Sequence, residues 1–128
     1  MSTTLHNPKI EAFNDSVRQP IDQVVVTLRE LLGAKLVAYI ATVSATRVVR
    51  DWADGIRQPN GGTEVKLRHA YRIARLIERS EGAAIVPTWF QGMNPYLGDK
   101  SPARVLHESD FESSAPEILA AANSFVGS

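Results

Sequence analysis

Cysteine is absent from this chain of 128 residues. Its absence excludes a disulfide framework, a thiolate zinc site and a thiol nucleophile. No apolar run approaches the roughly 18 residues that a membrane span needs, and no basic-then-apolar leader precedes a small-residue cleavage site. We therefore expect a cytoplasmic protein that makes no membrane contact and forms one domain, or two small subdomains with a shared core.

The formal net charge is zero, but the charges are unevenly distributed. Residues 1–43 hold four basic and four acidic groups, residues 44–79 hold eight basic and four acidic groups, and residues 80–128 hold two basic and six acidic groups. A basic middle favours contact with phosphate, whereas an acidic end repels nucleic acid and is better suited to a protein partner.

Apolar residues recur at helical spacing along most of the chain, which predicts an all-α fold. We expect a compact helical domain over residues 20–80 and a small helical domain over residues 81–128. Residues 1–19 show little periodicity and predict a flexible arm, with one or two helical turns around residues 9–17. Helices are expected over residues 20–32, 64–80 and 117–126. Gly33 is expected to end the helix over residues 20–32, and Thr63 to cap the start of the helix over residues 64–80. Ser113 or Ser114 is expected to cap the start of the last helix.

Residues 36–59 predict two short helices joined by a tight turn. Ser44 is a suitable N-cap for the second helix, and Trp52 is the large anchor of its buried stripe. Gly55 stands where a helix end needs a positive φ, and Pro59 cannot resume the helix. The outward face of the second helix carries hydroxyl, guanidinium and carboxylate groups: Thr46, Arg47, Arg50, Asp51 and Asp54.

This stretch resembles the Xre/Cro-type helix-turn-helix in a set of spaced residues: Ala38, Ser44, Val49, Trp52, Gly55 and Pro59. Two features depart from that pattern. Thr42 stands where the turn usually has glycine, and the turn is one residue longer than the tightest versions. The two aspartates would face phosphate unless they pair with nearby arginines.

The resemblance implies binding to double-stranded DNA, as a two-fold dimer on a palindromic operator. We expect Thr46, Arg47 and Arg50 to reach base edges in the major groove, and Ser44, Arg57 and Lys66 to hold phosphates. A row of arginines on the following helix is either a phosphate-tracking surface or an ordinary solvated face: Arg68, Arg72, Arg75 and Arg79.

The C-terminal block looks like the toxin-binding domain of Xre/MbcA/ParS-type antitoxins. The matching features are Trp89, the turn Asn94–Pro95–Tyr96–Leu97 with Gly98, and the helix start Ser101–Pro102–Ala103–Arg104–Val105–Leu106. Local chemistry agrees, because Asn94 and Pro95 favour a turn and Ser101 can cap a helix that begins at proline. Trp89, Leu97 and Leu106 are also expected to serve as core residues.

By that resemblance, the protein is an antitoxin of a type II toxin-antitoxin system that represses its own operon. Its partner would be a RES-type toxin, an enzyme that degrades NAD. The residues expected to contact the toxin lie on the last helix and tail: Asn123, Phe125, Val126 and Ser128.

Catalysis is not expected. The three histidines lie in separate segments without metal-ligand spacing, and no nucleophile elbow or phosphate-cradling loop is present. We expect no metal and no cofactor. Two alternatives to the antitoxin remain open: a stand-alone helix-turn-helix repressor, such as a phage type, whose C-terminal domain dimerises, and a pure protein-interaction module.

Overall fold

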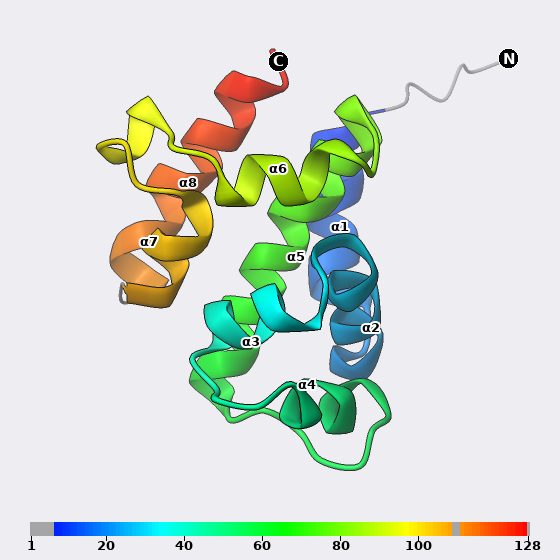
Figure 1. The fold of residues 1–128 in the computed structure, drawn as a ribbon. Helices are drawn as coiled ribbons and strands as arrows, with labels where there is room; N and C mark the ends of the chain where they lie inside the picture. Colours follow the sequence, from blue (N-terminus) through cyan, green and yellow to red (C-terminus); the bar gives the residue numbers. More distant parts are fainter. Residues whose placement is uncertain (1–6, 109–110, 128) are drawn as a thin grey trace, which may run out of the picture.

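The computed structural model describes residues 7–108 and 111–127, without the side chains of residues 111–113. The regular secondary structure of the described residues is all helical, with no strand, which confirms the all-α prediction. In chain order the elements are α1 (Pro8–Arg18), α2 (Ile21–Leu32), α3 (Ala34–Ala41), α4 (Thr46–Ala53), α5 (Gly61–Glu81), α6 (Ile85–Gln91), the 3-10 helix η1 (Pro95–Leu97), α7 (Pro102–Glu108) and α8 (Phe111–Phe125) (Figure 1).

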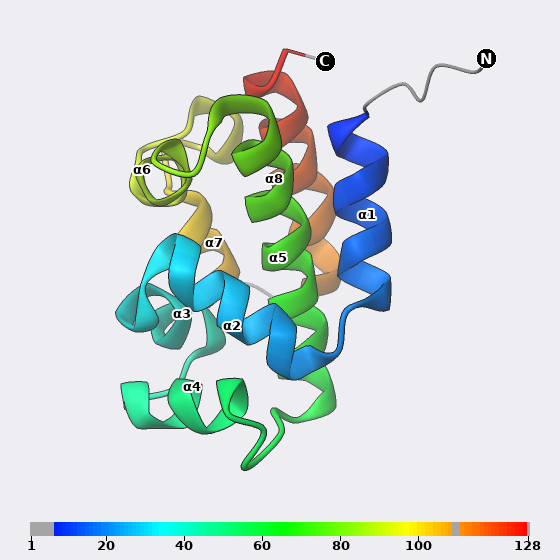
Figure 2. The ribbon, with the colours of Figure 1, turned by 90° about the vertical axis from the view of Figure 1, so that its right-hand side faces the viewer.

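The long helix α5 is the element that the others surround. Its 21 residues pack against α1, α2, α3, α6 and α8, and Figure 2 shows it running through the middle of the molecule. Leu67, Ile73 and Ile77 are fully buried on it. The helix begins at Gly61, earlier than expected, because the side chain of Asn60 accepts a hydrogen bond from the amide of Thr63 at 2.8 Å. The prediction that Thr63 is the N-cap is therefore wrong.

The one or two helical turns expected around residues 9–17 are part of a longer regular helix, α1, which packs along α5. The side chain of Asn7 caps α1, and Ala12 is buried against the core. Asp15 forms ion pairs with Arg75 and Arg79 of α5. These contacts link residues about sixty positions apart in the chain, so local sequence patterns did not reveal them.

The C-terminal half follows the expected local chemistry at its turn. The side chain of Asn94 accepts from the amide of Tyr96 at 3.0 Å, and Pro95 opens η1. The hydroxyl of Ser101 accepts from the amide of Arg104 at 3.1 Å, so α7 begins at Pro102 as predicted. As expected, the apolar residues of this block are buried: Trp89, Leu97 and Leu106.

The start of α8 differs from the prediction. The helix begins at Phe111, so Ser113 and Ser114 lie inside it and do not cap it. Ser114 is buried, and Pro116 also lies inside the helix. Packing of α8 against α5 and α7 therefore extends the helix beyond the start that the local proline signal suggested.

Both halves of the chain contribute to one hydrophobic core. Buried residues of the cluster come from α2 and α5 as well as from α6, α7 and α8, with Phe90 and Ile118 fully enclosed beside Leu28 and Ile73. Within residues 7–108 and 111–127, none of the helices combines the length and the apolar character that spanning a membrane requires.

Candidate functional site

Helix α4 is anchored by one apolar side and leaves the other side in solvent. Val49, Trp52 and Ala53 are buried, with Trp52 only 5 % exposed. The helix packs against α2 and α3. Because these anchors lie at i, i+3 and i+4, the residues between them are fixed on the outer surface.

The connection between α3 and α4 is made without the expected serine cap. Thr42 adopts the left-handed conformation with φ of 61° in the place of the usual glycine, and its amide bonds back to the carbonyls of Ala38 and Tyr39. The N-cap of α4 is Ala45, which has extended backbone and no capping side chain. The prediction of Ser44 as N-cap is wrong by one residue, since the first turn closes from the Val48 amide to the Ala45 carbonyl. Gly55 has the expected positive φ, 74°.

The outer face of α4 carries the residues that the sequence assigned to base contact. Thr46, Arg47 and Arg50 are all exposed. Asp51 does not stand alone beside them, because its carboxylate lies 3.5 Å from Arg57 and 4.0 Å from Arg50. The Asp51 side chain is only 14 % exposed, whereas those of Arg50 and Arg57 are 58 % and 53 % exposed. The arginines therefore present their charge outward and screen the carboxylate behind them.

The residues assigned to phosphate contact are not equally available. Ser44, at the α3–α4 turn, and Arg57, just beyond α4, are exposed near the N- and C-terminal ends of this helix. Lys66 on α5 is partly buried, and this burial lowers the pKa of its ammonium group. The exposed cationic surface of the site is thus centred on Arg47, Arg50 and Arg57.

The arginine row of α5 is neither a phosphate-tracking surface nor a plain solvated face. Arg68 pairs with Glu64 and donates to the backbone carbonyls of Ser16 and Gln19 at the end of α1. Arg75 and Arg79 pair with Asp15. These three side chains fasten α1 to α5.

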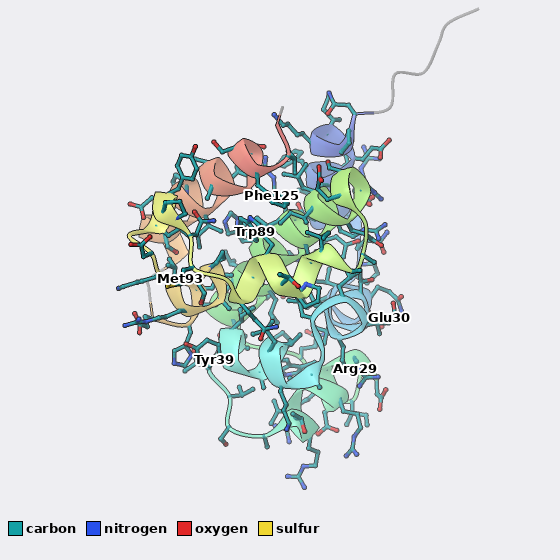
Figure 3. The ribbon with its side chains drawn as sticks, turned by 45° about the horizontal axis from the view of Figure 1, so that its top comes forward. Arg29, Glu30, Tyr39, Trp89, Met93 and Phe125 are labelled. Atoms are coloured by element: carbon teal, nitrogen blue, oxygen red, sulfur yellow. The ribbon has the colours of Figure 1, made fainter. Side chains whose placement is uncertain are left out.

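A second surface lies at the other end of the molecule, where α6, η1 and α8 line an open cavity of about 310 Å³. Figure 1 places α4 at the lower end of the molecule and the C-terminal end of α8 at the upper end. We call the cavity the C-terminal groove. Its apolar rim is formed by Met93, Tyr96 and Phe125, whose side chains are 44–81 % exposed. Its floor includes the buried Trp89. The ring centroids of Trp89 and Phe125 lie 6.2 Å apart. Figure 3 shows the two side chains next to each other.

Of the four residues predicted for toxin contact, the structure describes three, and only one of them lines the groove. Phe125 lines the groove. Asn123 and Val126 are partly buried, and Ser128 lies outside the described residues. Met93 and Tyr96 were missed by sequence reasoning, although both flank the Asn94–Pro95 turn that it singled out. Large apolar residues next to a turn that must lie at the surface are the signal that could have found them.

An aromatic contact ties the two halves together between α3 and α7. The rings of Tyr39 and His107 stack with centroids 4.0 Å apart and an interplanar angle of 9°. His107 Nδ1 donates to the backbone carbonyl of Tyr39 at 2.6 Å. Near this contact, Glu108 pairs with Arg104, and the hydrogen bond between them lowers the pKa of the exposed carboxylate.

Comparisons of the chain with protein-family models, with curated proteins and with solved structures find no match. Among the residues that the structure describes, no three His, Asp or Glu side chains gather in a way that could hold a metal ion.

Proposed function

We propose that the protein is a cytoplasmic DNA-binding regulator and antitoxin of a type II toxin-antitoxin system, which reads its operator through α4. The observation that carries this proposal is the outer face of α4, where Thr46, Arg47 and Arg50 are exposed while Asp51 is screened by arginines. Without that screening, a carboxylate on a reading helix would oppose the phosphates.

The dimensions of α4 suit a major groove. An α-helix with its side chains is about 10–12 Å across, and the major groove of B-DNA is about 12 Å wide, so α4 can enter it. Arg47 or Arg50 can bridge O6 and N7 of guanine, and Thr46 can contact a neighbouring base. Ser44, Arg57 and Lys66 are the proposed phosphate contacts, with Lys66 the least accessible. One helix this short reads few bases, so a dimer on a palindromic operator is proposed.

The C-terminal groove is the proposed site for a RES-type toxin. Its aromatic rim and its position away from α4 support a protein partner that binds while α4 holds DNA. Phe125 would make the central contact, with Asn123, Val126 and Ser128 along the same end of the chain. Simultaneous binding of both partners is what autorepression by a toxin–antitoxin complex requires.

The test is fluorescence anisotropy with DNA from immediately upstream of the protein's own gene. We expect selective binding that weakens steeply as salt rises, and at least tenfold weaker binding for the Arg47→Ala/Arg50→Ala variant, since one bidentate base contact contributes about 1–3 kcal/mol. Lys100→Ala/Arg104→Ala removes the same charge far along the chain and should bind like wild type. Adding a RES-type toxin should raise the anisotropy further without releasing the DNA.

Equal binding by both double variants would contradict a reading role for α4. A folded protein that binds no operator DNA but still binds the toxin would leave the interaction-module alternative, which the exposed rim of the C-terminal groove favours.

A further inference from the structure

Helix α1 has one face that is fixed against the protein. Ala12 and Ser16 are buried on that face, and Asp15 pairs with Arg75 and Arg79 of α5. Together with the bonds from Arg68 to the last carbonyls of α1, these contacts set the rotation of the helix about its axis. Figure 2 shows α1 at the edge of the molecule, beside α5.

The face of α1 that points away from Ala12 is apolar where a surface helix is normally polar. Ile10, Phe13 and Val17 recur there at i, i+3 and i+7, and all three are 47–62 % exposed. Val65 of α5 continues the apolar surface across the seam between the two helices. We call these four residues the α1 stripe. A cavity of about 300 Å³ opens between Phe13, Val17 and Val65, bordered by Arg72.

Cations surround the α1 stripe. Arg72 is the one member of the α5 arginine row that forms no ion pair within the described residues; its guanidinium instead lies 4.9 Å from the centroid of the Phe13 ring. Lys9 and Arg18, near the two ends of α1, are likewise without an ion pair in residues 7–108 and 111–127. An apolar stripe bordered by unpaired cations fits a ligand whose apolar face is flanked by carboxylates.

We propose that the α1 stripe is a docking site for an acidic amphipathic helix of a partner protein. Anchors at i, i+3 and i+7 match the contact pattern of one helix laid along another, and the partner's carboxylates would reach Lys9, Arg18 and Arg72. A second copy of this chain fits less well. Antiparallel stripes that match Ile10 with Val17 place Lys9 opposite Arg18, which are like charges.

A lipid surface also fits less well than a helix. Arg72 lies over the Phe13 ring at the border of a cavity, where a side-chain carboxylate can enter and a flat layer of headgroups cannot. The site is distinct from the α4 face and from the C-terminal groove, so it stands independently of the proposed function.

The test is calorimetric titration of the full-length protein with a synthetic helical peptide that has leucine at i, i+3, i+4 and i+7 and glutamate on its other faces. We expect binding of this peptide and none of the same peptide with lysine in place of glutamate. Val17→Ser should weaken binding at least tenfold and Arg72→Gln several-fold. Ile56→Ser removes an apolar side chain that is exposed elsewhere on the surface, at 71 % against 62 % for Val17, and should change nothing. Circular dichroism checks that each variant is folded.

Three results would overturn the proposal. One is equal binding of the glutamate and lysine peptides, or binding of neither. Another is binding to vesicles of anionic phospholipid that Val17→Ser removes while the glutamate peptide does not compete. The third is a concentration-dependent dimer in sedimentation that Val17→Ser dissociates and the peptide leaves intact. Operator binding by Val17→Ser serves as an independent control, because α1, which carries Val17, does not pack against α4.

Discussion

At the scale of single residues, ionisable groups are stabilised in two different ways. The carboxylates of Asp51 and Asp15 lie beside arginines, at the α4 face and at the α1–α5 seam respectively. His69 lies inside α5 and is buried, and burial together with the nearby charge of Arg72 lowers the pKa of its imidazole to about 4. The buried imidazole therefore stays neutral until the pH falls well below the ordinary pKa of histidine.

The His69 imidazole should make stability depend on pH. Its ordinary pKa is about 6.5, so as the pH falls the unfolded chain binds the proton before the folded one does, and the free energy of unfolding decreases between about pH 6.5 and pH 4. Those 2.5 units correspond to about 3 kcal/mol at most. Urea denaturation at pH 7 and pH 4.5 should show a smaller loss for His69→Gln than for wild type. Equal losses would contradict neutral burial.

At the scale of elements, the turn between α3 and α4 holds a strained residue. Thr42 is β-branched, exposed and left-handed, with φ of 61°. That conformation costs an L residue roughly 1–2 kcal/mol, which glycine avoids at an entropic cost of about 0.5–1 kcal/mol. Thr42→Gly should therefore stabilise the protein by up to about 1 kcal/mol in urea denaturation, measured as a higher midpoint at an unchanged m value.

Gly55 offers the matched control at the end of α4. A Cβ there would meet open space, so only the φ of 74° opposes a side chain. Gly55→Ala should destabilise the protein by about 1 kcal/mol. If both substitutions lowered the midpoint, Thr42 would not be strained as its backbone indicates.

Local rules predicted the elements whose signals lie within one or two turns. Pro102 after Ser101, Asn94 before Pro95 and the positive φ of Gly55 all followed from side-chain chemistry and turn geometry. Local rules misplaced helix starts where two cap candidates lie close together, as with Asn60 and Thr63. They predicted only part of α1, because the partners of Asp15 lie on α5.

In the candidate sites, too, local patterns predicted some features and missed those that depend on contacts between separate elements. Helical periodicity correctly placed Arg47 and Arg50 outside and Trp52 inside. It could not show that Asp51 is screened by Arg57, because that contact needs the chain to turn back after Gly55. Nor could it show the C-terminal groove, because residues from α6, η1 and α8 line it together.

At the scale of the whole molecule, the α4 face and the C-terminal groove lie at opposite ends but are both supported by α5. Helix α5 packs against α2 and α3, which hold α4, and also against α6 and α8, which form the C-terminal groove. The Tyr39–His107 stack adds a second link between the halves, near the surface. A partner bound at either end therefore acts on a single packed body.

This shared core predicts that both halves unfold together, and the two tryptophans of the chain can report on each half separately. Trp89→Phe leaves Trp52 beside α4, and Trp52→Phe leaves Trp89 at the floor of the C-terminal groove. In each variant, the urea midpoint from tryptophan fluorescence should coincide with the midpoint from circular dichroism. A Trp89 signal that changes at lower urea than the helical signal would show instead that the C-terminal half unfolds alone.

A further variant distinguishes the core from the surface link as the cause of this coupling. Tyr39→Ala/His107→Ala removes the stack and the 2.6 Å hydrogen bond from a partly exposed position but leaves every buried contact of α5 in place. We expect this variant, made in each single-tryptophan background, to lose stability while its fluorescence and circular dichroism midpoints still coincide. Separation of the midpoints would mean that the stack couples the two ends. Coincident midpoints would mean that the packing of α5 against both halves couples their unfolding, so that the two halves unfold together.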